Sequence, residues 1–378
     1  MEFDLSWLLL GLPAAFALGW VASRLDMRQL RIENRQAPKA YFRGLNFLLN
    51  EQQDQAIDAF IEAVRNDPDT SELHFALGNL FRRRGEYERA VRVHEHLLSR
   101  GDLSRAERHR AQHALALDFL KAGLLDRAEE ALRKLEGTEY ESQARLALLS
   151  IYERTRDWAG ASEIARKLDA SGEGSFQLRL AHYLCEQAQQ APGAEAERLV
   201  REAMAVAPGA PRPAMDLAAL QQRAGDVRAA LDTLTALARQ NPAAVGLLAP
   251  MLAVSARACG QAEAARGLLR AHYDTAPSLN VLEALASLED DPQAARQLYA
   301  LHLEREPSLV AAGRWMAGEP ASGSGGFQPL LQRALDQAAR PLTRYRCVAC
   351  GFEANRHFWQ CPGCQAWDSY PPRRVEEL

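Results

Sequence analysis

The sequence predicts an all-α protein, in which an array of paired helices lies between an N-terminal transmembrane helix and a small C-terminal metal-binding ribbon. Three observations carry this prediction. Residues 5–22 contain no charged side chain, Gly, Ala and Pro recur about every 34 residues, and four cysteines form two C-x-x-C pairs near the end of the chain. Together these features divide the chain into segments 1–22, 23–38, 39–307, 308–340 and 341–378.

The composition argues against a nucleic-acid binder. The chain has 378 residues and a net charge of −4, so it is long enough for a repeat array and lacks the basic excess that nucleic-acid binding requires. Of its six cysteines, Cys185 and Cys259 stand alone in Ala-rich helical contexts and are expected to be small buried residues. A chain that needs four of its cysteines as thiolates belongs in a reducing compartment.

Residues 5–22 form the predicted membrane anchor. As a helix that rises about 1.5 Å per residue they span about 27 Å, close to the hydrocarbon thickness of a bilayer. Trp7 and Trp20 lie near the two ends, where indole rings favour the interface. A cleaved signal peptide is the alternative. It would have a basic start, whereas Glu2 and Asp4 precede this apolar run. We therefore predict an uncleaved anchor.

A basic juxtamembrane helix is predicted over residues 23–38. It contains Arg24, Arg28, Arg31 and Arg35, and basic residues next to a spanning helix stay on the cytoplasmic side. The repeats and the C-terminus are therefore expected to face the cytoplasm, in agreement with the reducing environment that thiolates require. The arginines either only fix this topology or also touch anionic lipid headgroups.

Residues 39–307 follow the frame of the tetratricopeptide repeat, whose units are pairs of antiparallel helices. A small residue on each helix lets the two helices approach, a glycine opens the turn between them, and a proline ends the second helix. In the second unit Gly78, Gly85 and Ala90 occupy this frame. The same positions recur at Ala56, Ala128, Ala161, Ala196, Ala230, Ala265 and Ala295, at Gly123, Gly225 and Gly260, and at Pro208, Pro242, Pro277 and Pro307. We predict about eight helical pairs.

The array is expected to form a right-handed superhelix whose concave face binds extended peptides or partner domains. Two units depart from the frame. The fifth has Ala191, Pro192 and Gly193 in place of the turn glycine, which suggests a longer or kinked turn, and the eighth is shortened at residues 290–292. A bundle of Ala-rich helices is the alternative, and the recurring frame argues against it.

Residues 308–340 are predicted to be a linker that contains a helix. A Gly- and Ser-rich tether at 318–326 precedes residues 327–340, which have an apolar side made of Leu330, Leu331, Ala334, Leu335 and Ala338. The helix leads directly into the module at 341–378, which is too small to build a core without a metal.

The strongest functional signal is the set of four cysteines in this module, Cys347, Cys350, Cys361 and Cys364. Each C-x-x-C pair places two thiolates around a tight turn, and two such turns make a tetrahedral sulfur cage that suits one zinc or iron ion. Two unrelated pairs or two disulfides are the alternative. Four sulfurs leave no coordination position for water or substrate, so the ion is expected to be structural and not catalytic.

Aromatic side chains crowd the same module: Tyr345, Phe352, Phe358, Trp359, Trp367 and Tyr370. They exceed what so small a fold can bury, so some are expected to pack back on the repeats or to form a partner surface. Ribbons of this kind also bind nucleic acid, through stacking and basic side chains. The module has the basic residues Arg344, Arg346, Arg356, Arg373 and Arg374, diluted by Glu353, Asp368, Glu376 and Glu377.

The sequence contains no recognisable set of catalytic residues. It has no P-loop and none of the motifs of serine hydrolases, zinc proteases or dinucleotide-binding enzymes. His109 and His113 are four residues apart, but no third ligand lies in register with them. These two, with His94 and His96, are expected to be surface or groove histidines, not metal ligands. We therefore predict that the chain is not an enzyme.

In chain order, the acidic start, the anchor, the basic segment, the repeat array and the C-terminal motif resemble the lipopolysaccharide assembly protein B family of Gram-negative bacteria. The resemblance covers essentially the whole chain. Its most specific part is the rubredoxin-like motif matched by Tyr345, Cys347, Cys350, Gly351, Phe352, Trp359, Cys361, Pro362, Cys364 and Trp367. The resemblance implies that the four cysteines are the metal ligands of a rubredoxin-like module. Only ten residues separate the two pairs, fewer than in a free rubredoxin, so an electron-transfer role does not follow.

The resemblance also implies a function and partners. Members of this family are inner-membrane adaptors that limit lipopolysaccharide synthesis by helping a membrane AAA protease to degrade the lipid A deacetylase, and another inner-membrane regulator controls them. The alternative is a repeat scaffold for an envelope or exopolysaccharide assembly machine without a proteolytic role. The sequence leaves open whether iron or zinc is bound, which repeat residues contact partners, and whether the chain forms a homodimer.

Overall fold

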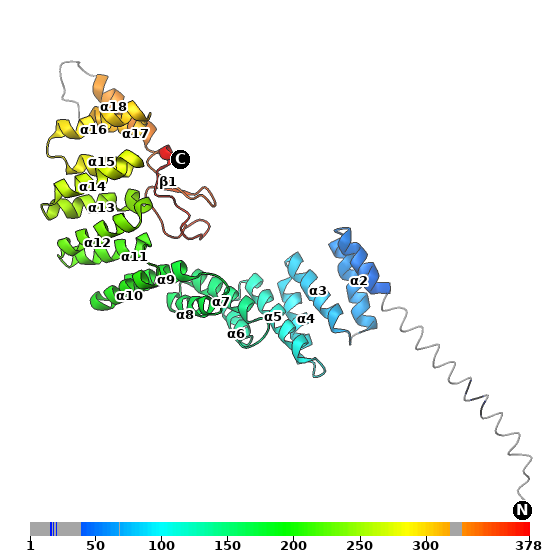
Figure 1. Ribbon diagram of the computed structural model, residues 1–378. Coiled ribbons are helices and arrows are strands. Elements are labelled where there is room, and N and C mark those ends of the chain that lie inside the picture. The colour runs from blue at the N-terminus through cyan, green and yellow to red at the C-terminus, as the bar shows by residue number, and fades with distance from the viewer. Residues whose placement is uncertain (1–15, 17, 19, 21–38, 68, 318–326) are drawn as a thin grey trace, which may run out of the picture. The chain divides into compact units, whose positions relative to one another are not determined.

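The computed structural model describes residues 39–67, 69–317 and 327–378, together with positions 16, 18 and 20 (Figure 1). In these ranges the chain is almost entirely helical and ends in a small ribbon with two short strands. It divides into two compact units, Met1–Thr155 and Arg156–Leu378, called unit 1 and unit 2 below.

The predicted anchor and juxtamembrane helix lie outside the described residues, apart from Phe16, Leu18 and Trp20, which are helical and exposed. In the part of the chain that the structure describes, no helix is both long and apolar enough to cross a bilayer. The anchor and its topology therefore stay predictions.

Unit 1 is built from consecutive helix pairs. Residues 39–49 form a helix that packs on α2, as shown by Gly44, whose backbone leaves no room for a Cβ beside the ring of Phe60. The later helices of the unit pack against their neighbours in chain order. They are α2 (Gln53–Asn66), α3 (Ser71–Arg84), α4 (Tyr87–Ser99), α5 (Arg105–Ala122), α6 (Leu125–Arg133) and α7 (Glu141–Thr155).

Unit 2 continues with the same kind of pairs (Figure 1). Its helices are α8 (Trp158–Ala170), α9 (Gln177–Gln190), α10 (Gly193–Val206), α11 (Pro211–Arg223), α12 (Val227–Gln240), η1 (Pro242–Ala244), α13 (Val245–Ala258), α14 (Ala262–Thr275), α15 (Leu279–Leu288), α16 (Pro292–Arg305), α17 (Leu309–Ala317) and α18 (Phe327–Ala339). The odd-numbered helices from α9 to α17 are the first helices of their pairs. The ribbon follows, with β1 (Tyr345–Arg346), β2 (Glu353–Ala354) and η2 (Val375–Glu377).

The repeat frame predicted from the sequence agrees with these helices. The small residues Ala56, Ala90, Ala128, Ala161, Ala196, Ala230 and Ala265 are all buried, while Ala295 is only partly buried. Gly85, Gly123, Gly225 and Gly260 lie at the ends of first helices with φ between 66° and 84°, the left-handed conformation that commonly closes a helix. The right-handed superhelix of the whole array stays a prediction.

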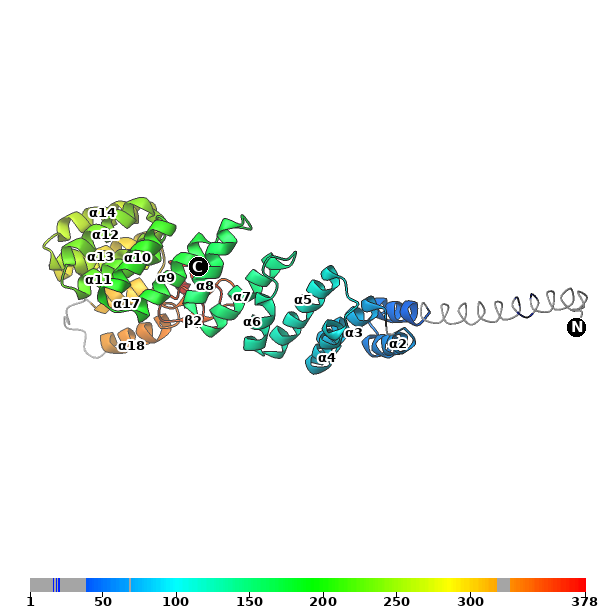
Figure 2. The same ribbon diagram turned by 90° about the horizontal axis from the view of Figure 1, so that it is seen from below.

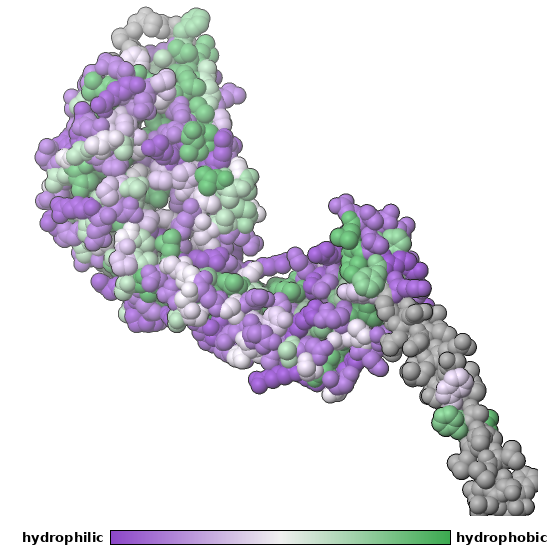
Figure 3. All heavy atoms as spheres, turned by 45° about the vertical axis from the view of Figure 1, so that its right-hand side comes forward, coloured by the Kyte–Doolittle hydropathy of each residue, from purple (hydrophilic) through white to green (hydrophobic). Residues whose placement is uncertain are grey.

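Two segments differ from expectation. The turn of the fifth pair contains only Ala191 and Pro192 between α9 and α10, so it is no longer than the turn between α3 and α4. In the segment interpreted as a linker, α17 and α18 pack against each other as a further helix pair. Helix α18 exposes Phe327, Leu330 and Leu331, and Figure 3 shows apolar surface at this end of unit 2.

Candidate metal centre

Two nearly identical turns present the four cysteines. Around the first turn β1 pairs with β2 in antiparallel register, with Tyr345 opposite Ala354, and around the second a bridge joins Gln360 to Trp367. In the first turn the amide of Gly351 donates to the carbonyl of Cys347, at 2.9 Å, and in the second Gln365 donates to Cys361, at 2.8 Å. Gly351 and Gln365 both have positive φ, of 78° and 62°. The repeated geometry aims backbone amides at the sulfurs.

The sulfur atoms have the spacing of a tetrahedral metal site. Cys347 Sγ lies 3.8 Å from Cys364 Sγ, Cys350 Sγ lies 3.7 Å from Cys361 Sγ, and all four sulfurs lie within 4.8 Å of one another. Four thiolates bound at about 2.3 Å to one tetrahedral ion would stand about 3.8 Å apart. The four cysteines therefore form a site able to bind one structural metal ion, which would hold the two turns together.

The local environment favours thiolates at the buried cysteines. Burial alone would raise the pKa of Cys347, but its hydrogen bond with Ser369 Oγ and those from the amides of Cys350 and Ala349 lower it to about 6. At Cys350 the amide of Phe352 favours the thiolate, yet burial and the three neighbouring sulfurs raise the pKa to about 12. Four adjacent thiolates repel one another and therefore require a bound cation. A divalent metal ion supplies that positive charge.

Trp367 and Trp359 pack back on the helix array, as the aromatic excess of the module predicts. Trp367 stacks on His182 of α9, with ring centroids 4.8 Å apart and planes 19° apart, and also meets Trp158 of α8 and Tyr183 edge to face. The ring of Trp359 lies 6.0 Å from that of His182. Figure 2 shows β2 next to α8 and α9. The metal module is therefore docked on the array through two indole rings.

A buried polar cluster lies beneath this contact. His182 Nε2 lies 2.8 and 2.9 Å from the two carboxylate oxygens of Asp368, which belongs to the metal module. On its other side Arg212 Nη1 lies 3.5 Å from His182 Nδ1, and Arg212 donates to Glu186 at 2.7 Å. Arg212 is 1% exposed and also pairs with Asp216, whose pKa is raised by burial. Such a network fixes one docking geometry, since removing a partner leaves a buried charge uncompensated.

The last eight residues, 371–378, extend along the first helices of unit 2, and we call them the C-terminal tail. Glu377 Oε1 accepts from the amide of Leu279 at the start of α15, at 2.7 Å, and Glu376 Oε1 accepts from the amide of Leu309 at the start of α17, at 2.6 Å. These amides have no partner within their own helices, and a carboxylate there also interacts favourably with the helix dipole. The tail therefore caps two successive first helices.

Two further contacts hold the tail. Arg374 donates to Asn280 of α15 at 2.9 Å and forms an ion pair with Glu283 at 2.5 Å. Pro372 lies so close to α13 that a Cβ on Gly246 would stand 2.9 Å from its carbonyl oxygen. Unit 2 thus holds the tail on α13, α15 and α17, and holds the aromatic side chains of the module on α8 and α9.

Three sequence expectations are corrected or refined here. His94, expected at the surface or in a groove, is fully buried, and its Nδ1 lies 2.5 Å from Asp118 Oδ2. The reason is local: Gly78 faces the imidazole and leaves room for it. Cys185 is buried as expected, whereas Cys259 is only partly buried. His109 and His113, expected to be surface or groove histidines, are both partly buried, and His109 contacts Glu139 while His113 stacks on Tyr140.

Sequence reasoning did not identify His182, Arg212, Glu376 or Glu377 as contact residues. The tail glutamates followed a proline- and arginine-rich segment, where they seemed only to dilute its charge. The available signal was that the two capped helices, α15 and α17, have no acidic residue in their first turns, while Glu376 and Glu377 are adjacent acidic residues.

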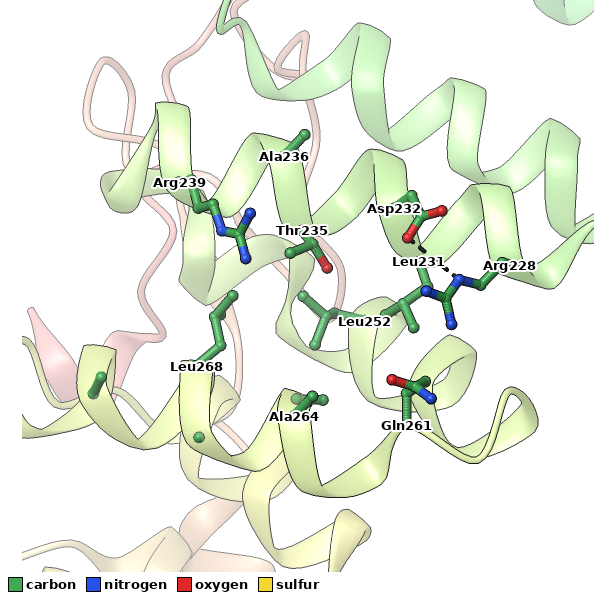
Figure 4. A pocket seen from close by; sticks show the side chains of 13 residues that line it. Arg228, Leu231, Asp232, Thr235, Ala236, Arg239, Leu252, Gln261, Ala264 and Leu268 are labelled. Atoms are coloured by element: carbon green, nitrogen blue, oxygen red, sulfur yellow. Dashed lines mark ion pairs between the residues drawn. The ribbon is translucent and has the colours of Figure 1, made fainter.

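A pocket of about 750 Å³ opens between the second helices α12 and α14 (Figure 4). Its polar lining includes Arg228 and Asp232, which pair with each other at 3.5 Å, and its floor is made of small and aliphatic side chains such as Ala264 and Leu268. This lining suits packing against another surface better than acid–base chemistry.

Comparisons with known proteins agree with this picture. Residues 345–371 match a family model described as a rubredoxin metal binding domain. The chain is 31% identical over 383 residues to lipopolysaccharide assembly protein B of Escherichia coli K12 and 29% identical over 391 residues to the protein of that name from Haemophilus influenzae. Each match covers 98% of this chain and 98% of the relative.

Among solved structures, the chain is similar to a tetratricopeptide repeat protein from Parabacteroides merdae. The TM-score is 0.36 and the identity 16%, and the match covers 67% of this chain and 98% of the other. A likeness at this score carries no argument about fold or function.

Proposed function

The chain belongs to the lipopolysaccharide assembly protein B family, and from that membership we propose that it is an adaptor that regulates lipopolysaccharide biosynthesis from the cytoplasmic side of the inner membrane. It promotes degradation of the lipid A deacetylase by a membrane AAA protease. The observation that carries the proposal is the match along 98% of both chains, which includes the anchor segment, the array and the metal module.

An adaptor needs no reactive group of its own. It raises the rate of proteolysis by holding substrate and protease at high effective concentration, and anchoring all of them in one membrane increases that concentration further. The helix pairs supply the surfaces for such contacts, because stacked repeats expose extended faces. The metal module is attached at a fixed place, since two indole rings hold it on unit 2.

The uncharged residues 5–22 and the arginines that follow support the proposed location. A reporter enzyme fused after Leu378 tests it, and we expect activity only from the reporter that works in the cytoplasm. Activity of a periplasmic reporter, or a mature chain that starts near Trp20, would contradict the proposed topology.

Affinity purification of the tagged full-length protein from membranes tests the proposed function. We expect a membrane AAA protease and the lipid A deacetylase to copurify, and the amount of deacetylase to rise in cells that lack the protein. Copurification of polymer-export components with unchanged deacetylase would instead support a scaffold for envelope assembly.

A further inference from the structure

The first helices of unit 1 place matching side chains side by side. On α3 these are Glu72, Phe75, Asn79, Arg82 and Arg83, and on α5 they are Arg110, His113, Leu117, Leu120 and Lys121. Both sets have the same spacing and so occupy one side of each helix. The contacts join them: Arg110 pairs with Glu72 and lies 4.0 Å over the ring of Phe75. We call this surface the α3–α5 face.

Basic charge is concentrated on these two helices. Helix α3 has three arginines and one glutamate, and α5 has four basic and two acidic residues. The second helices differ, since α2 has one arginine against three acidic residues, α4 has two against two, and α6 has two against three. On the α3–α5 face Arg83 and Lys121 are exposed, and neither has an ion-pair partner among the residues that the structure describes. The face therefore has free positive charge.

The centre of the α3–α5 face is rigid. Arg82 donates to the carbonyl of Ala114 at 3.1 Å and to Asp118 Oδ1 at 2.8 Å. Asp118 is itself fully buried and bonded to the buried His94. Because the buried carboxylate of Asp118 contacts both Arg82 and His94, the guanidinium of Arg82 is fixed, with 19% of its side chain exposed. A fixed cation loses little entropy when it meets an anion.

In unit 2 the first helices already hold three acidic residues of the metal module and tail: His182 of α9 contacts Asp368, and backbone amides at the starts of α17 and α15 bind Glu376 and Glu377. In unit 1 the first helices offer cations to the same kind of group. We propose that the α3–α5 face, centred on Arg83 and Lys121, binds an extended acidic segment of a partner protein. The proposal rests on the adaptor function above and names the chemistry of one partner.

The test uses the full-length protein in detergent and a fluorescein-labelled, glutamate-rich peptide, with binding followed by fluorescence anisotropy. The reference peptide has glutamine at every glutamate position. We expect the glutamate peptide to bind more tightly, and its affinity to fall as salt is added. The double variant Arg83→Glu with Lys121→Glu should weaken binding about tenfold or more, because like charges then face each other.

The matched control is Arg65→Glu with Arg92→Glu, which changes the net charge equally on the second helices α2 and α4. We expect it to keep the wild-type affinity. Equal weakening by both double variants, or equal affinity for the two peptides, would overturn the proposal. If the glutamate variant unfolds, Arg83→Gln with Lys121→Gln replaces it, and a retained affinity overturns the proposal.

Two competing anionic ligands, an oligonucleotide and phosphatidylglycerol vesicles, test whether the α3–α5 face prefers an acidic peptide. Tighter binding of an oligonucleotide or of phosphatidylglycerol vesicles at Arg83 and Lys121 would overturn the proposal in favour of nucleic acid or membrane. If the protein does not bind the peptide but still copurifies the deacetylase, the proposed binding site on the α3–α5 face is refuted and the adaptor function is not. Peptide binding by a protein that copurifies no lipopolysaccharide enzyme would support the surface and refute the adaptor function.

Discussion

The two units share one repeat architecture but use their first helices differently. In unit 2 the first helices α9, α13, α15 and α17 are covered by the metal module and the C-terminal tail of the same chain. In unit 1 the α3–α5 face has Arg83 and Lys121, which are exposed and without ion-pair partners among the described residues. Carboxylates of the same chain thus already contact the first helices of unit 2, whereas the α3–α5 face keeps two cations without such a partner among the described residues.

This difference has an energetic consequence. The metal module is too small to fold from its own core, so its metal supplies folding free energy that also orders the tail. The tail in turn caps α15 and α17. Metal binding is therefore coupled to the stability of unit 2. Variants that weaken the metal site or the tail are therefore expected to destabilise unit 2 more than unit 1.

The largest effect is expected from the double variant Cys347→Ser with Cys350→Ser. Loss of two thiolates releases the ion, and zinc binding contributes on the order of 10 kcal/mol or more to the folding of comparable small modules. The module and tail should become protease-sensitive while the helices of unit 1 stay protected. Metal analysis should fall from about one ion per chain to none.

Cys259→Ser is the matched control, because Cys259 is a partly buried cysteine outside the metal site. It should keep the ion and the protected tail. A double variant that retains its metal, or that retains full regulation in cells, would refute the role assigned to the four thiolates.

Ala230→Trp should cause the next largest effect, a loss of stability in unit 2. Ala230 is fully buried, and overpacking a buried helix contact costs about 1 to 3 kcal/mol or more. Thermal unfolding should show a lower Tm for unit 2, with neighbouring pairs affected because repeats stabilise each other. Ala90→Trp should do the same in unit 1. Ala236→Trp, at an exposed position of the same helix, should leave the Tm unchanged.

Replacing Glu377 by Gln tests the capping by the tail on a smaller scale. The variant keeps the size of the side chain but removes the charge at the start of α15, which should cost about 1 kcal/mol. Chemical denaturation should report the loss in unit 2 only. Glu304→Gln, on the exposed side of α16, is the control and should be neutral. Equal effects of the two variants would mean that the cap contributes nothing.

The smallest effect concerns pH. Burial lowers the pKa of His302, whose Nδ1 lies 2.5 Å from the hydroxyl of Tyr273. A lowered pKa in the folded state means that the unfolded chain takes up the proton first, so stability is present above the ordinary histidine pKa of about 6.5 and falls below it. His302→Gln should reduce the fall in Tm between about pH 7.5 and about pH 5.5. An unchanged fall would show that other groups determine it.

The sequence was sufficient to predict the helix pairs and a cluster of four cysteines able to bind one metal ion, because both follow from local spacing. Ala230 and Gly225 fall in a periodic frame, and the four cysteines lie in two short motifs. The contacts made by His182, Glu376 and Glu377 were not predictable in this way. Their partners, Asp368, Leu309 and Leu279, are separated from them by 186, 67 and 98 positions, and no periodic pattern links residues across such distances.

His94 is a second residue whose contacts the sequence context did not predict. Its sequence context predicted a surface or groove residue, yet it is buried against Gly78 and bonded to Asp118 of the next repeat. The available clue was that His94 follows Ala90 by four residues, as the buried Phe60 follows Ala56. The burial of His94 could be predicted only by considering three helices together, because Gly78 lies in α3, His94 in α4 and Asp118 in α5.

The central claim is that the metal couples the C-terminal tail to unit 2 and leaves unit 1 independent. Hydrogen–deuterium exchange measured on the full-length protein before and after metal removal by a chelator tests it most directly. The account predicts faster exchange at the amides of Leu279 and Leu309 and in residues 345–378, with unchanged exchange in α3 and α5. Unchanged exchange at Leu279 and Leu309 after the metal has left, or equal acceleration in both units, would contradict it.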